Sequence, residues 1–383
     1  MTMSPPSLLG PAALPHDDLT AVVAASLGRR LELDDWWVEP VDYDPGTPST
    51  GALLHVRGTG RDQGAGEPLP WSVFVKVLHS PRHWEHLHLV PPDARQRFVD
   101  SFPWRVEAEA LASDLPGRLP PGIRTPRVFR IDELGDDRVA LWLEDVVVAD
   151  TGWDLPRYAR AARVLGRWAA RRSGALLPAE LRAISGIGLR LWATGRLQGA
   201  FADLRDDRLW AHPLVAATAD PALRGDLLVL AARVPAMLDR LDTLLQAVGH
   251  GDASPQNLLV SAADPDTFVA IDISWQCPQA VGFDLGQLLV GLAHAGELPA
   301  SALPEVHAVL LPAFVEGLRE EGCQVAEADA AYGFEASLLL RSGFTAIPFQ
   351  RLGEPEGPEL AAELAQRVAL TRFIADLGLA LPR

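Results

Sequence analysis

The stretch that decides the fold is HGDASPQN, residues 250–257. It places a carboxylate, Asp252, five positions before a side-chain amide, Asn257, on one tight loop. Aspartate and asparagine often do no more than shape a turn, and this is the plain alternative for either residue taken alone. Whether the pair has a chemical role therefore depends on what the fold brings beside it.

Residues 257–260 and 268–273 are predicted to form a small hairpin that follows this loop. Both runs are apolar, and the segment between them contains Asp-Pro-Asp, which favours a turn. The hairpin returns Asp272, at the end of its second strand, to the side of Asp252 and Asn257. Three oxygen-bearing side chains then converge, which suits a hard cation such as Mg²⁺ together with substrate phosphates. One carboxylate is left to orient a hydroxyl.

Arginine and lysine are used very unequally in this chain. The chain has 34 Lys and Arg residues in 383, and Lys76 is the single lysine. A codon or genome bias explains the high ratio of arginine to lysine. A lysine that persists under such a bias is a candidate for chemistry that needs a compact point charge rather than the planar guanidinium of arginine. Chance retention is the alternative. Lys76 lies in a predicted strand, 72–78, joined to another at 52–56 by a long loop at 58–70.

The loop at 250–257 resembles the catalytic loop of the aminoglycoside phosphotransferases and related small-molecule kinases. This resemblance implies that Asp252 is the catalytic carboxylate and that His250 supports the loop. It also implies that Asn257 and Asp272 hold Mg²⁺ across the phosphates of the nucleotide.

Two nearby features bear on this resemblance. GFDL, residues 282–285, resembles a helix start of the same family and implies that Asp284 braces the catalytic loop. The family usually has tryptophan directly after its metal-binding aspartate, whereas here Ile273 follows and the tryptophan is Trp275. This departure leaves open which residues form the wall of the substrate pocket.

The resemblance continues in the first half of the chain. VFVKV is similar to the family's strand with a phosphate-binding lysine, which implies that Lys76 binds the α and β phosphates of ATP or GTP. Glu107 resembles the helix glutamate that pairs with it. Glu109 is a weaker alternative, because residues two apart on a helix lie about 200° apart and cannot both face the lysine. LWLED resembles the strand entering the hinge, which implies that the backbone of Glu144 and Val146 reads the purine base.

Two segments fit the family less well. PGTPSTG, residues 45–51, has the position of a glycine-rich phosphate loop, but a turn-rich linker has the same composition. The insert at 79–88 contains four of the ten histidines. Its spacing fits no standard zinc finger, so a surface or substrate-lid segment is favoured over a metal site.

The order of elements predicts an α+β, two-lobed fold like that of protein kinases. A helix at 17–29 precedes β-rich runs, and a helical pattern at 106–115 separates two pairs of strands. Beyond residue 146 the chain is mostly helical apart from the hairpin. We expect a disordered tail at 1–16, an N-terminal nucleotide-binding lobe at 17–146, and a C-terminal catalytic and substrate-binding lobe at 147–383.

Composition argues against several partners. A net charge of −16 disfavours nucleic acid, which requires a basic face. The chain has no basic run and no uninterrupted apolar stretch of membrane-spanning length, so we expect no membrane partner. Cys277 and Cys323 are too few for a disulfide scaffold, and a reducing cytoplasm is expected. The sequence does not set the oligomeric state.

The resemblance implies transfer of the γ-phosphoryl group of ATP or GTP to a hydroxyl of a small molecule, in antibiotic resistance or metabolism. Between Leu241 and Leu318 there are nine acidic residues and no Lys or Arg, which favours a neutral or cationic acceptor. A protein substrate is disfavoured, because residues 272–282 are too short for an activation loop. The alternative is a catalytically silent pseudokinase that binds nucleotide and regulates a partner.

Overall fold

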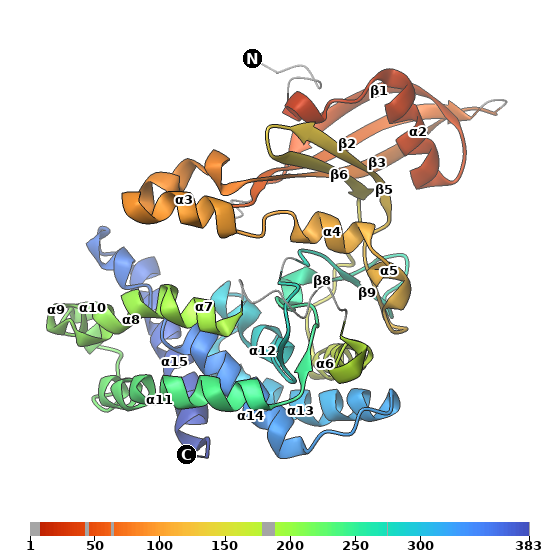
Figure 1. Ribbon diagram of the computed structural model, residues 1–383. Coiled ribbons are helices and arrows are strands. Elements are labelled where there is room, and N and C mark those ends of the chain that lie inside the picture. Colours follow the sequence, from red (N-terminus) through yellow and green to blue (C-terminus); the bar gives the residue numbers. More distant parts are fainter. Residues whose placement is uncertain (1–7, 43–45, 63–64, 178–187, 274, 383) are drawn as a thin grey trace. The chain divides into compact units, whose positions relative to one another are not determined.

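The structure is a computed structural model that describes residues 8–42, 46–62, 65–177, 188–273 and 275–382 (Figure 1). The chain divides into two compact units, each described here by itself. The first comprises Met1–Arg118, Arg124–Ala149 and Ser261–Pro265, and the second comprises Leu119–Ile123, Asp150–Val260 and Asp266–Arg383.

The first unit is built on a five-stranded antiparallel sheet with the strand order β1-β2-β3-β6-β5. Strand β3 is therefore the central strand. Short helices accompany the sheet (Figure 1). The bounds of these elements are α2 (His16–Leu27), β1 (Leu31–Pro40), β2 (Thr50–Asp62), β3 (Ala65–His79), α3 (Pro92–Ser101), α4 (Val106–Ala112), α5 (Leu115–Arg118), β5 (Val128–Gly135) and β6 (Arg138–Glu144).

Alternate residues of this sheet belong to two different apolar layers. In β6, Ala140 and Trp142 share a buried cluster with the apolar residues of α2. Leu141 and Leu143 share a second cluster with those of α4. Successive side chains of a strand point to opposite faces, so α2 and α4 cover opposite faces of the sheet. This explains why β6 reads as a continuous apolar run rather than an alternating one.

Residues 8–16 lead into the first long helix and have a defined structure, while residues 1–7 of the predicted tail lie outside the described residues. A 3₁₀ turn spans Gly10–Ala12, and Leu9 and Ala12 are buried in the cluster that also contains α2. The prediction of a disordered tail over 1–16 is therefore wrong for 8–16. Its prolines fit at the start of short turns, where no amide donor is needed, and its apolar residues find a surface to cover.

The strands of the first unit are longer than the sequence predicts. The expected loop at 58–70 is instead the paired ends of β2 and β3. Gly58 lies against the Trp71 ring and the Asp35 carbonyl, where a Cβ would come within 2.7 Å, so this glycine permits close packing rather than marking a loop. Strand β1 was not predicted, because a bulge between Leu33 and Trp36 breaks its alternation.

The second unit is mainly helical and carries short strands. The bounds of its elements, with β4 at the passage between the two units, are β4 (Ile123–Arg124), α6 (Leu155–Arg171), α7 (Leu189–Thr194), α8 (Arg196–Arg205), α9 (Asp207–Trp210), α10 (Pro213–Ala216), α11 (Leu223–Thr243), β7 (Gln246–Ala247), β8 (Leu258–Val260), β9 (Phe268–Ala270), β10 (Gln279–Ala280), α12 (Asp284–His294), α13 (Leu303–Glu320), α14 (Glu327–Leu338) and α15 (Pro358–Ala380).

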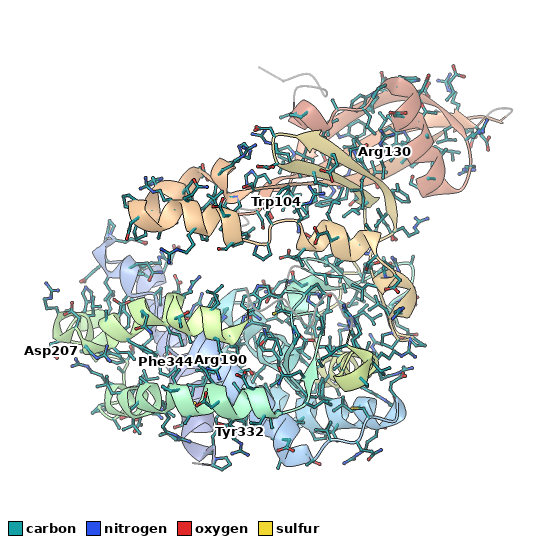
Figure 2. The ribbon with its side chains drawn as sticks, viewed as in Figure 1. Trp104, Arg130, Arg190, Asp207, Tyr332 and Phe344 are labelled. Carbon is teal, nitrogen blue, oxygen red and sulfur yellow. The ribbon has the colours of Figure 1, made fainter. Side chains whose placement is uncertain are left out.

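Close contacts and ion pairs fix these helices to one another. A Cβ on Gly166 of α6 would lie 2.1 Å from the Phe314 carbonyl oxygen of α13, so the two helices cross at backbone distance. Arg190 of α7, labelled in Figure 2, forms ion pairs with Asp239 and Asp242 of α11. In the part of the chain that the structure describes, no helix is long and apolar enough to cross a membrane.

The sequence pattern predicts a single helix over 328–345, and the structure interrupts it. Helix α14 ends at Leu338, and Leu339–Gly343 form a wider π turn. Turns of this kind are rare and often occur at functional sites. The middle residue of this one, Arg341, takes part in the site described below.

Candidate active site

The lysine of the first unit is held on the central strand of the sheet. Lys76 pairs across β3 with Leu53 of β2 and Leu141 of β6. Val73 and Val75 belong to the cluster on the α2 face, so the alternation of the strand turns Lys76 to the face that α4 covers. The lysine is therefore presented to the helix that carries the two candidate glutamates.

Glu107, in the first turn of α4, forms an ion pair with Lys76, with 2.6 Å between Oε2 and Nζ. The two side chains are only 6% and 10% exposed. Glu109 is 66% exposed and lies near Arg105 instead. Of the two glutamates, Glu107 is the one that the structure brings to the lysine. Removing one partner of a buried ion pair typically costs about 3–5 kcal/mol, so each charge depends on the other.

Glu144 and Val146, the residues predicted for the hinge, lie at the end of β6 and just beyond it. The Glu144 amide donates to the Arg127 carbonyl, and its carboxylate receives a two-point contact from Arg124. Burial alone would raise the pKa of the Glu144 carboxyl, but hydrogen bonds from Arg124 and from the Arg127 amide outweigh it and lower the pKa. Val146 follows in a half-buried stretch without regular structure. The Glu144 side chain thus stabilises the strand end, while a base-reading role for this backbone stays a prediction.

The segment proposed as a glycine-rich loop connects β1 and β2. Pro45 lies outside the described residues, and Gly46 has a φ of +55°. Residues 46–54, the end of β1 and the start of the histidine-rich insert line a cavity of about 440 Å³ within the first unit. The structure thus places insert residues His79 and His83 beside the candidate loop.

Asp284 holds the loop at 250–257 in the second unit by contacts with the loop backbone. Its carboxylate accepts hydrogen bonds from the amides of His250, at 2.9 Å, and Gly251, at 2.8 Å. Burial raises the pKa of the Asp284 carboxyl, and the hydrogen bonds from these two amides oppose the rise. A Cβ on Gly249 would lie 2.0 Å from the Asp284 carboxylate. Only glycine therefore allows the backbone to pass this close to the Asp284 side chain.

His250 is fully buried beneath the loop. Its Nδ1 accepts a hydrogen bond from the Asp252 amide at 3.2 Å, and its ring lies edge-on to Trp168. With Nδ1 as the acceptor, the proton of the neutral ring is on Nε2. The structure therefore gives His250 a structural contact with the backbone of Asp252.

The hairpin returns the backbone beside Asp272 to Asn257, whose side chain contacts Asp252. Asn257 donates through Nδ2 to the Asp252 carbonyl at 2.9 Å, and the same nitrogen lies 3.4 Å from Oδ2 of Asp252. The Ile271 amide donates to the Asn257 carbonyl, which places Asp272 one residue from this contact. Asp252, Asn257 and Asp272 thus lie at the same end of the β8–β9 hairpin, while the convergence of their side chains on a metal ion stays a prediction.

Two residues here adopt the left-handed backbone conformation. Asp272 has a φ of +57°, a region that aspartate tolerates better than most residues and that occurs often at functional sites. Gly251 has a φ of +86°, and a Cβ on it would lie 2.2 Å from Cβ of Trp275. Protein kinases have arginine at this position of the loop, and no such side chain fits here.

Arg341 of the π turn is the site residue that the sequence did not reveal. Its Nη2 donates to Oδ1 of Asp252 at 2.7 Å, and its Nη1 donates to the Gly251 carbonyl at 2.6 Å. The guanidinium lies 4.5 Å from the centre of the Trp275 ring and 5.6 Å from that of Phe283. The sequence signal is the absence of any Lys or Arg from 241 to 318, so a cationic partner of Asp252 has to come from outside this segment.

The donor set suits the magnesium ion that the kinase fold implies. Nδ2 of Asn257 donates to the Asp252 carbonyl, so the amide oxygen and the carboxylate of Asp272 are the groups that would hold the ion. Amide and carboxylate oxygens are the hard ligands that Mg²⁺ prefers, with phosphates and water completing its shell. Among the residues the structure describes, no group of three or more His, Cys, Asp or Glu side chains could hold a metal ion, the histidine-rich insert included.

Comparison with known proteins identifies the fold. No family model and no curated protein sequence matches this chain. The aminoglycoside phosphotransferase from Alicyclobacillus acidocaldarius subsp. acidocaldarius DSM 446 is similar over 97% of each chain, at 14% identity and a TM-score of 0.50. Spectinomycin phosphotransferase bound to ADP and spectinomycin matches 96% of this chain and 98% of its own, at 11% identity and 0.47. Aminoglycoside-3'-phosphotransferase of type VIII matches 79% and 92%, at 22% identity and 0.44.

The chain therefore has the two-lobed, protein-kinase-like α+β fold of the aminoglycoside phosphotransferases. The resemblance inferred from residues 250–257 is confirmed for the fold. The chemistry of the site is argued separately below from the residues of this chain.

Proposed function

We propose that this protein is a small-molecule kinase that transfers the γ-phosphoryl group of ATP or GTP to a hydroxyl of its acceptor. The observation that carries the proposal is the contact between Asp252 and Asn257 on a loop that the buried Asp284 holds by two amides, with the Ile271 amide bonded to Asn257 so that Asp272 follows at the same end of the hairpin. A turn-shaping role accounts for one such residue but does not require all four together. Catalysis of this type consists mainly of positioning and charge stabilisation, which such a loop supplies.

In this proposal Asp252 orients the acceptor hydroxyl and receives its proton. The hydroxyl oxygen forms a bond to the γ-phosphorus while the bond from that phosphorus to the bridging oxygen breaks, and the nucleoside diphosphate leaves. Asn257 and Asp272 hold Mg²⁺, which neutralises phosphate charge when bound. His250 and Asp284 keep the loop in shape.

The first unit contributes the nucleotide contacts. Lys76, fixed by Glu107, binds the α and β phosphates, and the backbone near Glu144 and Val146 reads the purine. The point charge of lysine suits this role better than the wider fork of arginine. This accounts for a single lysine among 34 basic residues.

The acceptor is proposed to be a small alcohol that is neutral or cationic, because residues 241–318 contain nine acidic residues and no Lys or Arg. We place the reaction in the cytoplasm, in antibiotic modification or in metabolism. Neither nucleic acid nor a membrane is expected as a partner.

The direct experiment presents purified protein, Mg²⁺, and ATP or GTP to a panel of aminoglycosides, sugars, amino alcohols, nucleosides and macrolides. A product heavier by one phosphoryl group, formed with equimolar nucleoside diphosphate, supports the proposal. Nucleotide-dependent thermal stabilisation without any product across the panel would favour the pseudokinase instead.

A further inference from the structure

Arg341 holds one particular oxygen of the candidate catalytic carboxylate. Its Nη2 lies 2.7 Å from Oδ1 of Asp252, whereas Oδ2 has only the long 3.4 Å contact with Asn257. The Asp252 side chain is 28% exposed and that of Arg341 is 11% exposed. The carboxylate is thus anchored at one oxygen by a buried cation, and its other oxygen has no short contact with the described residues.

The guanidinium is itself held on several sides. Nη1 donates to the Gly251 carbonyl, and the Trp275 and Phe283 rings lie within cation–π distance. Trp275 in turn packs against Phe283 and against Trp192 of α7. A planar fork with two hydrogen bonds and aromatic neighbours has little freedom, so it imposes its own geometry on Asp252.

The π turn that carries Arg341 is also anchored. Leu339 and Leu340 are fully buried, and Ser342 accepts a hydrogen bond from Gln287 of α12. Just beyond the turn, Phe344, labelled in Figure 2, packs edge-on against Phe201 of α8. The arginine therefore extends to the catalytic loop from a rigid base in the C-terminal helices.

We propose that Arg341 is a positioning residue that fixes the side chain of Asp252, so that Oδ1 is occupied and Oδ2 faces the acceptor hydroxyl. This inference rests on the proposed phosphotransferase function for its kinetic consequence only. The geometric claim, that Arg341 sets the conformation of Asp252, stands without it.

The test uses the full chain with Arg341→Met, which keeps the length of the side chain and removes its donors, and Arg341→Lys, which keeps the charge. Arg372→Met is the matched control. Arg372 and Asp226 form an ion pair of the same 2.7 Å length between α15 and α11, with side chains 20% and 31% exposed. Any loss that both Met variants share reflects the removal of a half-buried ion pair.

Crystal structures of the variants decide the geometric claim. In Arg341→Met we expect the Asp252 side chain to take another rotamer or several, while in Arg341→Lys and Arg372→Met it keeps the one seen here. If the Asp252 side chain keeps its conformation in Arg341→Met, the inference is overturned, whatever the activity of that variant.

Steady-state kinetics with an acceptor that the wild-type protein phosphorylates supply the second measurement. We expect Arg341→Met to lower kcat by about 100-fold with nucleotide affinity and acceptor KM little changed, since a misplacement of about 1 Å has this effect. Arg341→Lys should recover part of the loss, and Arg372→Met should retain full kcat. Unchanged or increased turnover in Arg341→Met, as for an inhibitory contact, contradicts the inference. Absence of transfer by the wild-type protein counts against the proposed function alone.

Discussion

Each of the two units contains a short ion pair that includes a candidate site residue, and the pairs differ in what surrounds them. Lys76 and Glu107 are 2.6 Å apart and both almost completely buried, on a strand and a helix of one unit. Arg341 and Asp252 are 2.7 Å apart, but the carboxylate is 28% exposed. The first pair is closed to solvent, whereas the second is open on the side of Asp252. Under the proposed function, the closed pair fixes a cation for the nucleotide phosphates and the open pair leaves a carboxylate accessible to the acceptor.

The largest expected effect concerns Asp272, a predicted metal ligand in the second unit. Asp272→Ala should lower phosphoryl transfer by about 1,000-fold or more and weaken Mg²⁺-dependent nucleotide binding, because the charge stabilisation that a bound metal ion supplies is worth several kcal/mol. Transfer rates and calorimetric titration with nucleotide, with and without Mg²⁺, measure both. Asp266→Ala is the control, since Asp266 is 88% exposed at the turn of the same hairpin. Nucleotide binding of the Asp272 variant that is as strong as that of the wild type would rule out the metal role.

The difference between the closed and the open pair predicts different stability costs. Glu107→Gln removes the carboxylate charge that lies 2.6 Å from the buried Lys76 and should lower the free energy of unfolding by about 3 kcal/mol. Asp252→Asn should lower it by less than about 1 kcal/mol, because its partner Arg341 keeps the Gly251 carbonyl and two aromatic contacts. Urea denaturation of the two isosteric variants makes the comparison. Equal losses in the two would mean that exposure does not separate these pairs.

The smallest effect concerns the hinge carboxylate, and it depends on pH. The pKa of Glu144 is lowered in the folded state, so its contribution to stability is present above the unfolded value of 4.5 and is lost as the pH falls through the folded value. Glu144→Gln should therefore cost up to about 1 kcal/mol at pH 7 and almost nothing well below pH 4. Unfolding free energies of wild type and variant at both pH values measure this, with the exposed Glu109→Gln as the control. A cost that grows on acidification would contradict the sign.

The parts of the site that were predictable from the sequence are those that local pattern determines. The hairpin following residue 257 requires Asp272 to return to Asn257, and the period of a helix allows only one of Glu107 and Glu109 to face the lysine. The fold followed from these motifs and from the order of strands and helices. What local pattern could not give depends on distant packing.

Arg341 is the clearest example of that limit. It lies 89 residues from Asp252, and its reach depends on a π turn that interrupts a regular helical pattern. The bulge of strand β1 breaks the alternation that would reveal it, and residues 8–16 carry no local signal of structure because their order comes from the sheet they cover. In each of these cases tertiary contacts outweigh the local signal.

The central claim is that Asp252 receives the proton of the acceptor hydroxyl, and one measurement tests it most directly. Phosphoryl transfer and nucleotide affinity are measured for the wild type and for Asp252→Asn, which keeps the shape of the side chain but cannot accept the proton. We predict transfer at least about 100-fold slower with nucleotide affinity unchanged, because positioned proton transfer contributes at least that much. Transfer at the wild-type rate by Asp252→Asn would contradict the claim.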